Sequence, residues 1–169
     1  MVNQLNLFEN EPMSTGKSGA KFGLDKLHRF VLWRIWNDRF PIIMYIGLNP
    51  STAKEIKNDR TISRLVKFTK EHGFGGLYML NLFTFVTAYP KELKTCRNPA
   101  MFANRYIKQY AKKSDKIVFC WGNFKESKTR AEEVKSMFTE AYCFKKNKDG
   151  SPRHPLYVPN LIELIKYYE

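Results

Sequence analysis

The chain has 169 residues, of which 43% are hydrophobic and 15% aromatic, and its 29 Lys and Arg against 16 Asp and Glu give a formal net charge of +13. This composition excludes a wholly disordered chain, and the length suits one domain with a sizeable core. No apolar run approaches the about 20 residues that span a bilayer, and the N-terminus lacks the basic region of a secretory signal, so we expect a cytoplasmic protein with no membrane partner. The positive surplus favours nucleic acid as the partner; a lysine-rich surface that only aids solubility is the alternative.

The three cysteines, Cys96, Cys120 and Cys143, lie far apart and form no C-x-x-C pair. This spacing argues against a disulfide framework, a zinc site or an iron–sulfur cluster. We therefore expect buried, reduced thiols, and neither a metal nor another cofactor.

Residues 9–21, "ENEPMSTGKSGAK", are rich in Gly, Ser, Pro and charge and contain almost nothing to bury. This composition predicts a flexible linker. We therefore expect a disordered tail over residues 1–21 and a folded domain over residues 22–169.

Strands and helices are predicted to alternate along the folded domain. Residues 29–36, "RFVLWRIW", are dense in aromatic and β-branched side chains and predict a strand, with a buried helix as the alternative. Continuous apolar runs typical of strands covered on both faces lie at 42–47, 76–81 and 116–122, with a weaker one at 141–144.

Between these runs the apolar period changes to that of a helix. Residues 59–73 place Ile62, Leu65 and Val66 on one side and close at Gly73, which predicts a helix with a C-terminal cap. Further helices are predicted at 98–113, 123–138 and 158–169. The alternation indicates a single α/β domain with a mostly parallel central sheet of about four strands and helices on both faces.

Polar segments follow the predicted strands, at the edge where α/β sheets bind their ligands. "GLNPST", "NLFTF", "WGNF" and "SPRHPLY" occupy these positions in chain order. We therefore expect Asn49, Asn81 and His154 to lie around one crevice. Each of them alone is commonly a turn former or a solvated loop residue, but four such segments at successive strand ends favour a site.

The segments "GLNP", "MLNLFTFV", "VFCWG" and "HPLY" resemble, in order and spacing, the motifs of the uracil-DNA glycosylase superfamily. In that superfamily a G-x-D/N-P turn positions the hydrolytic water, an L-L-N strand end reads the base, and an H-P loop carries the catalytic histidine. The segments "LNPSTA", "DRTISR", "NLF", "WG" and "GSPRHPLY" more closely resemble a bacterial and phage family labelled as a domain of unknown function, over about residues 29–159.

The resemblance implies two catalytic residues and a base pocket. Asn49 would hold the water, and His154 would donate to the base O2 as negative charge grows there. Asn81 would accept from N3–H of uracil and donate to O4, and cytosine would leave these groups unpaired at a cost of about 1–3 kcal/mol each. The base pocket would also contain Gly47, Leu48, Pro50 and Ser51.

Two positions depart from the superfamily. Many members have aspartate where this chain has Asn49, and an amide orients a water but takes no proton. The classical branch has a tyrosine that excludes the thymine methyl where this chain has Ser51, so discrimination against thymine must be weaker or come from elsewhere. The aromatic that would stack on the base stays open among Phe68, Phe74 and Phe83.

Other residues near the motifs are candidates for DNA contacts. Asp59 or Thr61 is expected to cap the helix that follows, and the free N–H groups there suit a phosphate. Leu156 or Tyr157 would be the wedge that fills the vacated base stack. The other candidates for backbone contacts, for which a solvated loop is the alternative, are Thr52, Arg60, Arg64, Lys145, Lys146, Lys148 and Arg153.

The tail contains "QLNLF", which resembles the Q-L-S/D-L-F peptide that docks on the bacterial sliding clamp. The residues that would bind the clamp are Gln4, Leu5, Leu7 and Phe8. Such a tether would raise the effective concentration of the enzyme at replicating DNA. A tail strand that packs on its own domain is the alternative.

These features predict a monofunctional DNA glycosylase for uracil or a related pyrimidine, because no lysine in the motifs is placed as a Schiff-base nucleophile. Two alternatives stay open: a non-catalytic DNA-binding or clamp-associated accessory protein, and an enzyme that acts on modified bases or free nucleotides.

Overall fold

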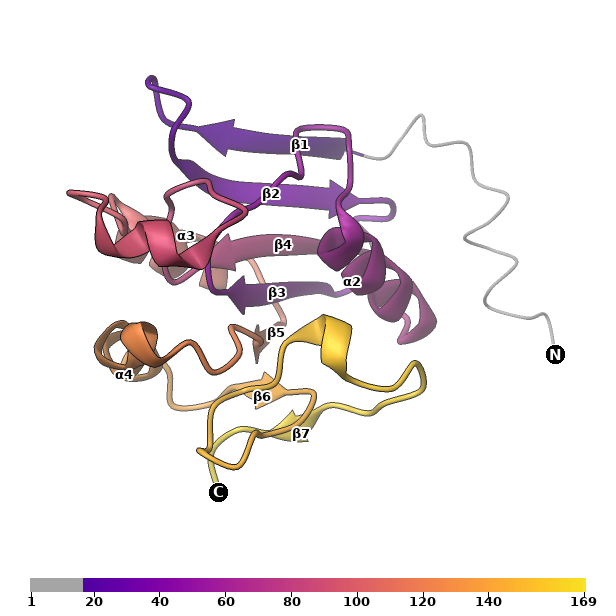
Figure 1. The fold of residues 1–169 in the computed structure, drawn as a ribbon. Coiled ribbons are helices and arrows are strands. Elements are labelled where there is room, and N and C mark those ends of the chain that lie inside the picture. The colour runs from indigo at the N-terminus through magenta and orange to yellow at the C-terminus, as the bar shows by residue number, and fades with distance from the viewer. Residues whose placement is uncertain (1–16) are drawn as a thin grey trace, which may run out of the picture.

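Three continuous apolar runs form the centre of a sheet, because strands covered on both faces need no polar alternation. The computed structural model describes residues 17–169, and in them the strand order is β1-β2-β4-β3-β5-β6-β7 (Figure 1). The strands are β1 (Lys17–Phe22), β2 (Arg29–Ile35), β3 (Ile42–Gly47), β4 (Gly76–Asn81), β5 (Lys116–Phe119), β6 (Tyr142–Cys143) and β7 (Ile165–Lys166).

Only the central part of this sheet is parallel. β3 pairs in parallel with β4 and β5, and β5 pairs in parallel with β6. The β1–β2, β2–β4 and β6–β7 pairs are antiparallel. The predicted single α/β domain is confirmed, but the mostly parallel sheet of about four strands is wrong: the sheet has seven strands, of which β4-β3-β5-β6 form the parallel part.

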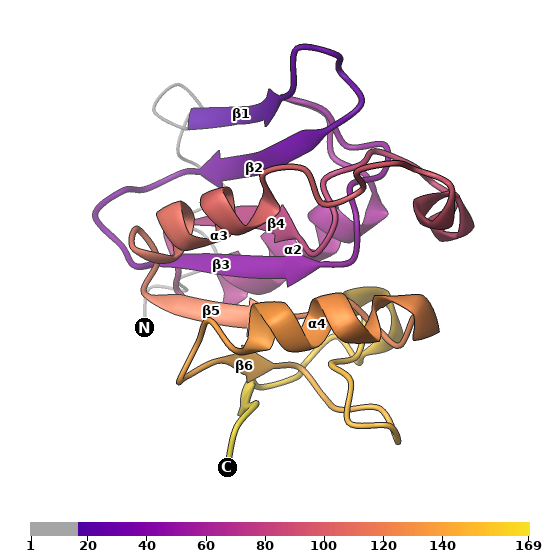
Figure 2. The ribbon, with the colours of Figure 1, turned by 90° about the vertical axis from the view of Figure 1, so that its left-hand side faces the viewer.

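Helices cover both faces of the sheet, as predicted. The helices are α2 (Arg60–Glu71), α3 (Ala103–Ala111) and α4 (Lys128–Lys135). Leu65 and Phe68 of α2 belong to the buried cluster on one face, whereas Ile107 of α3 and Val134 of α4 belong to the cluster on the other. Figure 2 shows α3 and α4 in front of the sheet and α2 behind it.

The predicted helices at 59–73, 98–113 and 123–138 are confirmed as α2, α3 and α4, each shorter than its predicted range. Three short 3-10 helices add to them: η1 (Pro90–Lys94), η2 (Lys125–Ser127) and η3 (Pro155–Tyr157). Of the two expected caps of α2, the carboxylate of Asp59 is the one used: its Oδ1 accepts a hydrogen bond of 2.8 Å from the backbone N–H of Ile62.

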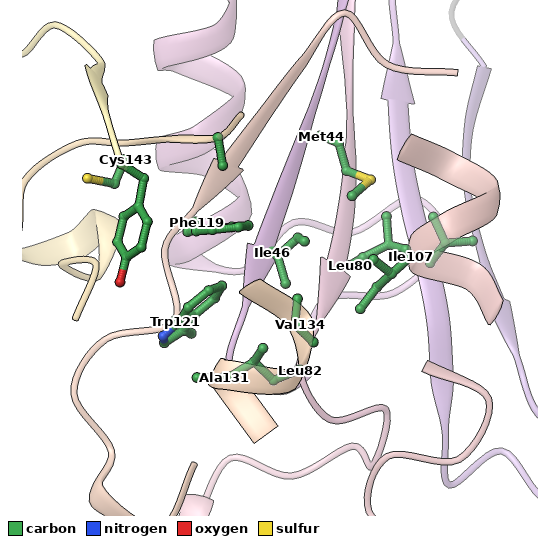
Figure 3. Close-up of a cluster of buried hydrophobic side chains, with 13 residues drawn as sticks. Met44, Ile46, Leu80, Leu82, Ile107, Phe119, Trp121, Ala131, Val134 and Cys143 are labelled. Atoms are coloured by element: carbon green, nitrogen blue, oxygen red, sulfur yellow. The ribbon is translucent and has the colours of Figure 1, made fainter. Parts of the chain in front are cut away.

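The cluster beneath α4 fixes the chain where β5 ends. Figure 3 shows Ile46 and Phe119 of the sheet close to Trp121 and to Val134 of α4. The rings of Phe119 and Trp121 lie 4.6 Å apart between centroids, and Trp121 is only 3% exposed. Burial of this kind stabilises a fold by about 1.5–3 kcal/mol per large apolar side chain, so the Trp-Gly turn after β5 is held rigidly by the core.

The edge strand β1 begins inside the predicted linker. Residues 17–21 pair with β2, from Lys17 opposite Ile35 to Lys21 opposite Val31, so the boundary between tail and domain at residue 21 is wrong. A Cβ on Gly19 would overlap the indole of Trp33. The small residues that suggest a linker thus make room for a large ring on the neighbouring strand.

The predicted helix at 158–169 is also wrong. The side chains from Leu161 to Leu164 alternate between exposed and half-buried, and the segment continues into β7, which pairs with β6. Ile162 and Leu164 pack on the cluster around α2, whereas Tyr167 packs on the opposite cluster. Because these apolar side chains contact both faces of the sheet, they cannot form the single stripe of an amphipathic helix.

None of the helices within residues 17–169 has the length and apolarity required to cross a bilayer. The predicted sliding-clamp peptide, residues 4–8, lies outside the residues that the structure describes.

Candidate active site

A cavity of about 280 Å³ lies at the carboxyl ends of β3, β4 and β5. Asn49, Asn81 and His154, expected to converge on one crevice, all line it. The strand order explains the position, because the chain passes from β3 to β4 on one side and later to β5 on the other. Ligand crevices of open α/β sheets form at such a switch point.

The Asn49-Pro50 turn is fixed by the loop that follows β4. The side-chain Nδ2 of Asn49 donates to the carbonyls of Pro50, at 2.9 Å, and Thr87, at 2.7 Å. The backbone N–H of Thr87 in turn donates to the Pro50 carbonyl. Since both amide protons of Asn49 are used, its Oδ1 is the atom left to accept a hydrogen bond from a ligand or a water. Pro50 itself is buried and does not line the cavity.

Asn81 presents an unsatisfied donor at the floor of the cavity. The side chain is 4% exposed and its Nδ2 has no hydrogen-bond partner. Its Oδ1 accepts from Nη2 of Arg29 at 3.4 Å, which orients the amide. A Cβ on Gly47 would stand 3.0 Å from Nδ2, so the glycine keeps the space beside the amide open. Buried polar groups are nearly always paired, so this unpaired N–H marks the floor as a place for a ligand acceptor.

His154 is held as a neutral imidazole. Its Nδ1 accepts a hydrogen bond of 3.2 Å from the backbone N–H of Leu156, so the neutral ring carries its proton on Nε2. Burial lowers the pKa of His154 from its ordinary value of 6.5, and the negative charge of Asp59 partly opposes that shift. The ring therefore offers a fixed N–H donor at neutral pH.

Two charged side chains of the cavity wall were not among the residues predicted for the base pocket. Arg29, the first residue of β2, is 3% exposed, and burial lowers its pKa to about 10, so it remains charged at neutral pH. Asp59 caps α2 and also lines the cavity, where it is the one carboxylate among the lining residues. The available signal for Arg29 was a basic residue at the start of a predicted strand whose next four residues are apolar.

Of the remaining base-pocket candidates, the small and aliphatic ones line the cavity and the phenylalanines do not. Gly47, Leu48 and Ser51 line the cavity. Phe68 is buried against Phe144 and His72 in the cluster around α2, and neither Phe74 nor Phe83 lines the cavity. Besides the imidazole of His154, the aromatic side chain that lines the cavity is the indole of Trp121, from the Trp-Gly motif.

A family model described as "Protein of unknown function (DUF1643)" matches residues 29–156, which is more than half of the chain. The chain belongs to this DUF1643 family. All the cavity-lining residues, from Arg29 to Leu156, fall in the matched range. No match was found among curated proteins or among solved structures.

Among the candidates for DNA contacts, this DUF1643 chain places Thr61 and Leu156 in the cavity wall. Leu156 is 36% exposed and Tyr157 is 74% exposed, so both stand at the surface beside His154. Four other candidates are exposed and do not line the cavity: Thr52, Arg60, Lys145 and Lys148. Arg153 is half-buried and does not line it either.

Two of the basic candidates have partners within the domain. The guanidinium of Arg64 donates to the carbonyls of Val158 and Pro159 and to the side chain of Asn160, and so joins α2 to the C-terminal segment. The ammonium of Lys146 lies 5.2 Å from the ring centre of Tyr167. Within residues 17–169, no three His, Cys, Asp or Glu side chains gather as a metal site would require.

Proposed function

We propose that this DUF1643 protein is a monofunctional DNA glycosylase that hydrolyses the N-glycosidic bond of uracil, or of a closely related keto pyrimidine, in DNA. The observation that carries the proposal is the convergence of Asn49, Asn81 and His154, from distant parts of the chain, on one cavity of about 280 Å³. That volume is close to the lower limit of about 300 Å³ for small-molecule pockets, which suits one extruded pyrimidine. The net charge of +13 supports a polyanionic substrate.

Asn81 reads the base in this proposal. Its unpaired Nδ2 donates to O4 of uracil, and the free lone pair of Oδ1, which already accepts from Arg29, accepts from N3–H. Cytosine presents an amine and an unprotonated ring nitrogen at these two positions. It would therefore leave buried groups unpaired, which costs about 1–3 kcal/mol for each group.

The bond between C1′ and N1 breaks with its electron pair left on the base, and a water oxygen then bonds to C1′. One proton of that water passes to solvent and the base anion takes up a proton after it leaves. His154 donates its Nε2–H to O2 as the anion forms, and Oδ1 of Asn49 accepts from the water and orients it. Since the sugar carbon is already strongly electrophilic, orientation suffices where a general base is lacking.

Asp59 supplies the negative charge that the positive sugar requires. Its carboxylate lines the cavity while its Oδ1 accepts from the N–H of Ile62, and this bond fixes its position. A fixed carboxylate beside developing positive charge stabilises the transition state more than water does, because no solvent must reorganise.

The test is incubation of the full-length protein with a uracil-containing oligonucleotide, followed by hot alkali, which cleaves the strand at an abasic site. Wild type is expected to cleave at the uracil position, and Asn81→Ala and His154→Ala to lower the single-turnover rate by about 10²–10³-fold, the range for loss of one donor to a developing anion.

A matched control is His72→Ala, since His72 bonds to the Phe68 carbonyl at the end of α2 and does not line the cavity. This variant should cleave like wild type. An intact strand with wild type, or equal cleavage by Asn81→Ala, would contradict the proposal. Salt-dependent DNA binding without cleavage would favour an accessory protein, and turnover of free nucleotides alone would favour the third alternative.

A further inference from the structure

Arg29 is a buried cation that makes no direct ion pair, although the negative charge of Asp59 in the same cavity wall acts on it and partly opposes the lowering of its pKa by burial. Its guanidinium donates to the Ala53 carbonyl at 3.2 Å and to Oδ1 of Asn81 at 3.4 Å, and its Nε has no hydrogen-bond partner. None of the ion pairs among the residues that the structure describes involves Arg29. A buried charge is costly unless it is paired and hydrogen-bonded, so the fold retains here a group that it does not itself satisfy.

Arg34, on the same strand, shows what a structural arginine looks like in this protein. It is 6% exposed and donates to the carbonyls of Trp33, Lys54 and Glu55 and to Oδ1 of Asn58, all within 2.9 Å. Each of its three nitrogens has a partner, and together they hold the 54–58 loop. Arg29 has fewer and longer bonds, so holding the fold together does not account for it.

The two residues that carry unsatisfied donors, Arg29 and Asn81, are in contact with each other. Arg29 bonds to one atom of the Asn81 amide, and the other atom of that amide, Nδ2, is itself unpaired. Both residues line the cavity. A ligand that satisfies them must bring acceptor atoms to this edge, and because one donor is charged, an acceptor that carries negative charge gains most.

We infer that Arg29 is a further catalytic residue, which binds the carbonyl edge of the extruded base and stabilises the anion that this base becomes. The inference rests on the proposed function and narrows its substrate class to keto pyrimidines that leave as anions. When the C1′–N1 bond breaks, the electron pair delocalises from N1 onto the carbonyl oxygens. His154 meets that charge at one carbonyl, and Arg29 meets it at the edge that Asn81 reads. A base with an exocyclic amine at this edge would place its own N–H donors against the donors of Arg29 and Asn81, with no acceptor between them.

Binding of free bases tests the inference without catalysis. Barbiturate, a pyrimidine trione that is an anion at neutral pH, is compared with neutral uracil by calorimetry on the full-length protein. Wild type should bind barbiturate about 10- to 100-fold more tightly than uracil, the effect of a hydrogen bond to a charged group. Arg29→Met should lose this preference, and Arg29→Lys should keep part of it. A wild type with no preference, or an Arg29→Met variant that retains it, would overturn the inference.

Excision provides the second readout. In single-turnover assays, Arg29→Met should slow excision of uracil more than excision of 5-fluorouracil, whose anion needs less stabilisation because fluorine withdraws electrons. Equal losses on the two bases would mean a merely structural role and would overturn the inference alone. Anion preference in a wild type that excises nothing would instead overturn the proposed function, and would leave Arg29 as an anion-binding residue without a catalytic role.

Discussion

Replacing each of the two buried arginines of β2 by methionine tests whether Arg34 stabilises the fold and Arg29 does not. Arg34→Met removes four hydrogen bonds of 2.7–2.9 Å and a fifth, of 3.4 Å, to the Gly19 carbonyl. Each bond to a charged group contributes about 1.5–3 kcal/mol, but the 54–58 loop is largely exposed, so water can satisfy part of the loss. We expect the free energy of unfolding to fall by about 2–4 kcal/mol.

Arg29→Met removes only two long hydrogen bonds, at 3.2 and 3.4 Å. Against that loss, the variant no longer buries an unpaired cation, and methionine fills similar space with apolar atoms. Replacing buried charges by well-packed apolar side chains is often neutral or stabilising, and this gain offsets the loss of a donor at the Ala53 carbonyl and at Oδ1 of Asn81. We therefore expect the free energy of unfolding to stay within about 1 kcal/mol of wild type.

Urea unfolding of the three full-length proteins, followed by tryptophan fluorescence and far-UV circular dichroism, measures both differences if the slopes agree. A loss for Arg29→Met as large as that for Arg34→Met would contradict this expectation, because Arg29 would then be a structural residue and its incomplete bonding would carry no functional meaning.

Two further substitutions and a pH titration probe the cavity. Gly47→Ala places a Cβ 2.6 Å from Cε of Met79 and 3.0 Å from Nδ2 of Asn81, and the displaced amide should lower the single-turnover rate by about 10²-fold; an unchanged rate would contradict the role of the cavity floor. Asp59→Asn keeps a capping side chain but removes the charge, so its melting temperature should stay near wild type while excision slows, whereas full activity would show that Asp59 only caps α2. His154 has a lowered pKa, so its neutral form should persist below pH 6.5. The contribution of His154 to stability and to the excision rate is then fully present above its unfolded-state pKa and is lost as pH falls through its lower folded-state pKa. The loss follows because a proton on Nδ1 would face the Leu156 N–H. An NMR titration that gives His154 a pKa above 6.5 would contradict this.

The sequence allowed prediction of the parts of the site that follow parallel strands. Asn49 and Asn81 come at or just after the ends of continuous apolar runs, and such ends meet at one edge of the sheet. His154 lies far along the chain, but its Pro-flanked loop follows the last parallel strand and reaches the same edge. The strand-end rule therefore placed three distant polar side chains in one cavity.

The strand-end rule does not apply to residues whose position depends on antiparallel pairing, and these residues were not predicted. Arg29 enters the cavity from β2, which pairs antiparallel with β4 and so brings its first residue, not its last, to the end of β4. Gly19 is a glycine because a Cβ there would overlap the Trp33 ring, not because it belongs to a linker. Tyr167 directly follows the short strand β7 and is not in a helix, because the final segment contacts both faces of the sheet. In each case a contact between distant residues decides the structure, and local composition does not encode it.

We propose that the cavity at the ends of β3, β4 and β5 releases a pyrimidine from DNA. Chromatographic detection of the free base, after incubation of wild type with an oligonucleotide labelled in its uracil ring, tests this claim most directly. We predict labelled uracil released as the free base by wild type and not by Asn81→Ala. Label that stays in the DNA with both proteins, while the wild type binds that DNA, would contradict the account.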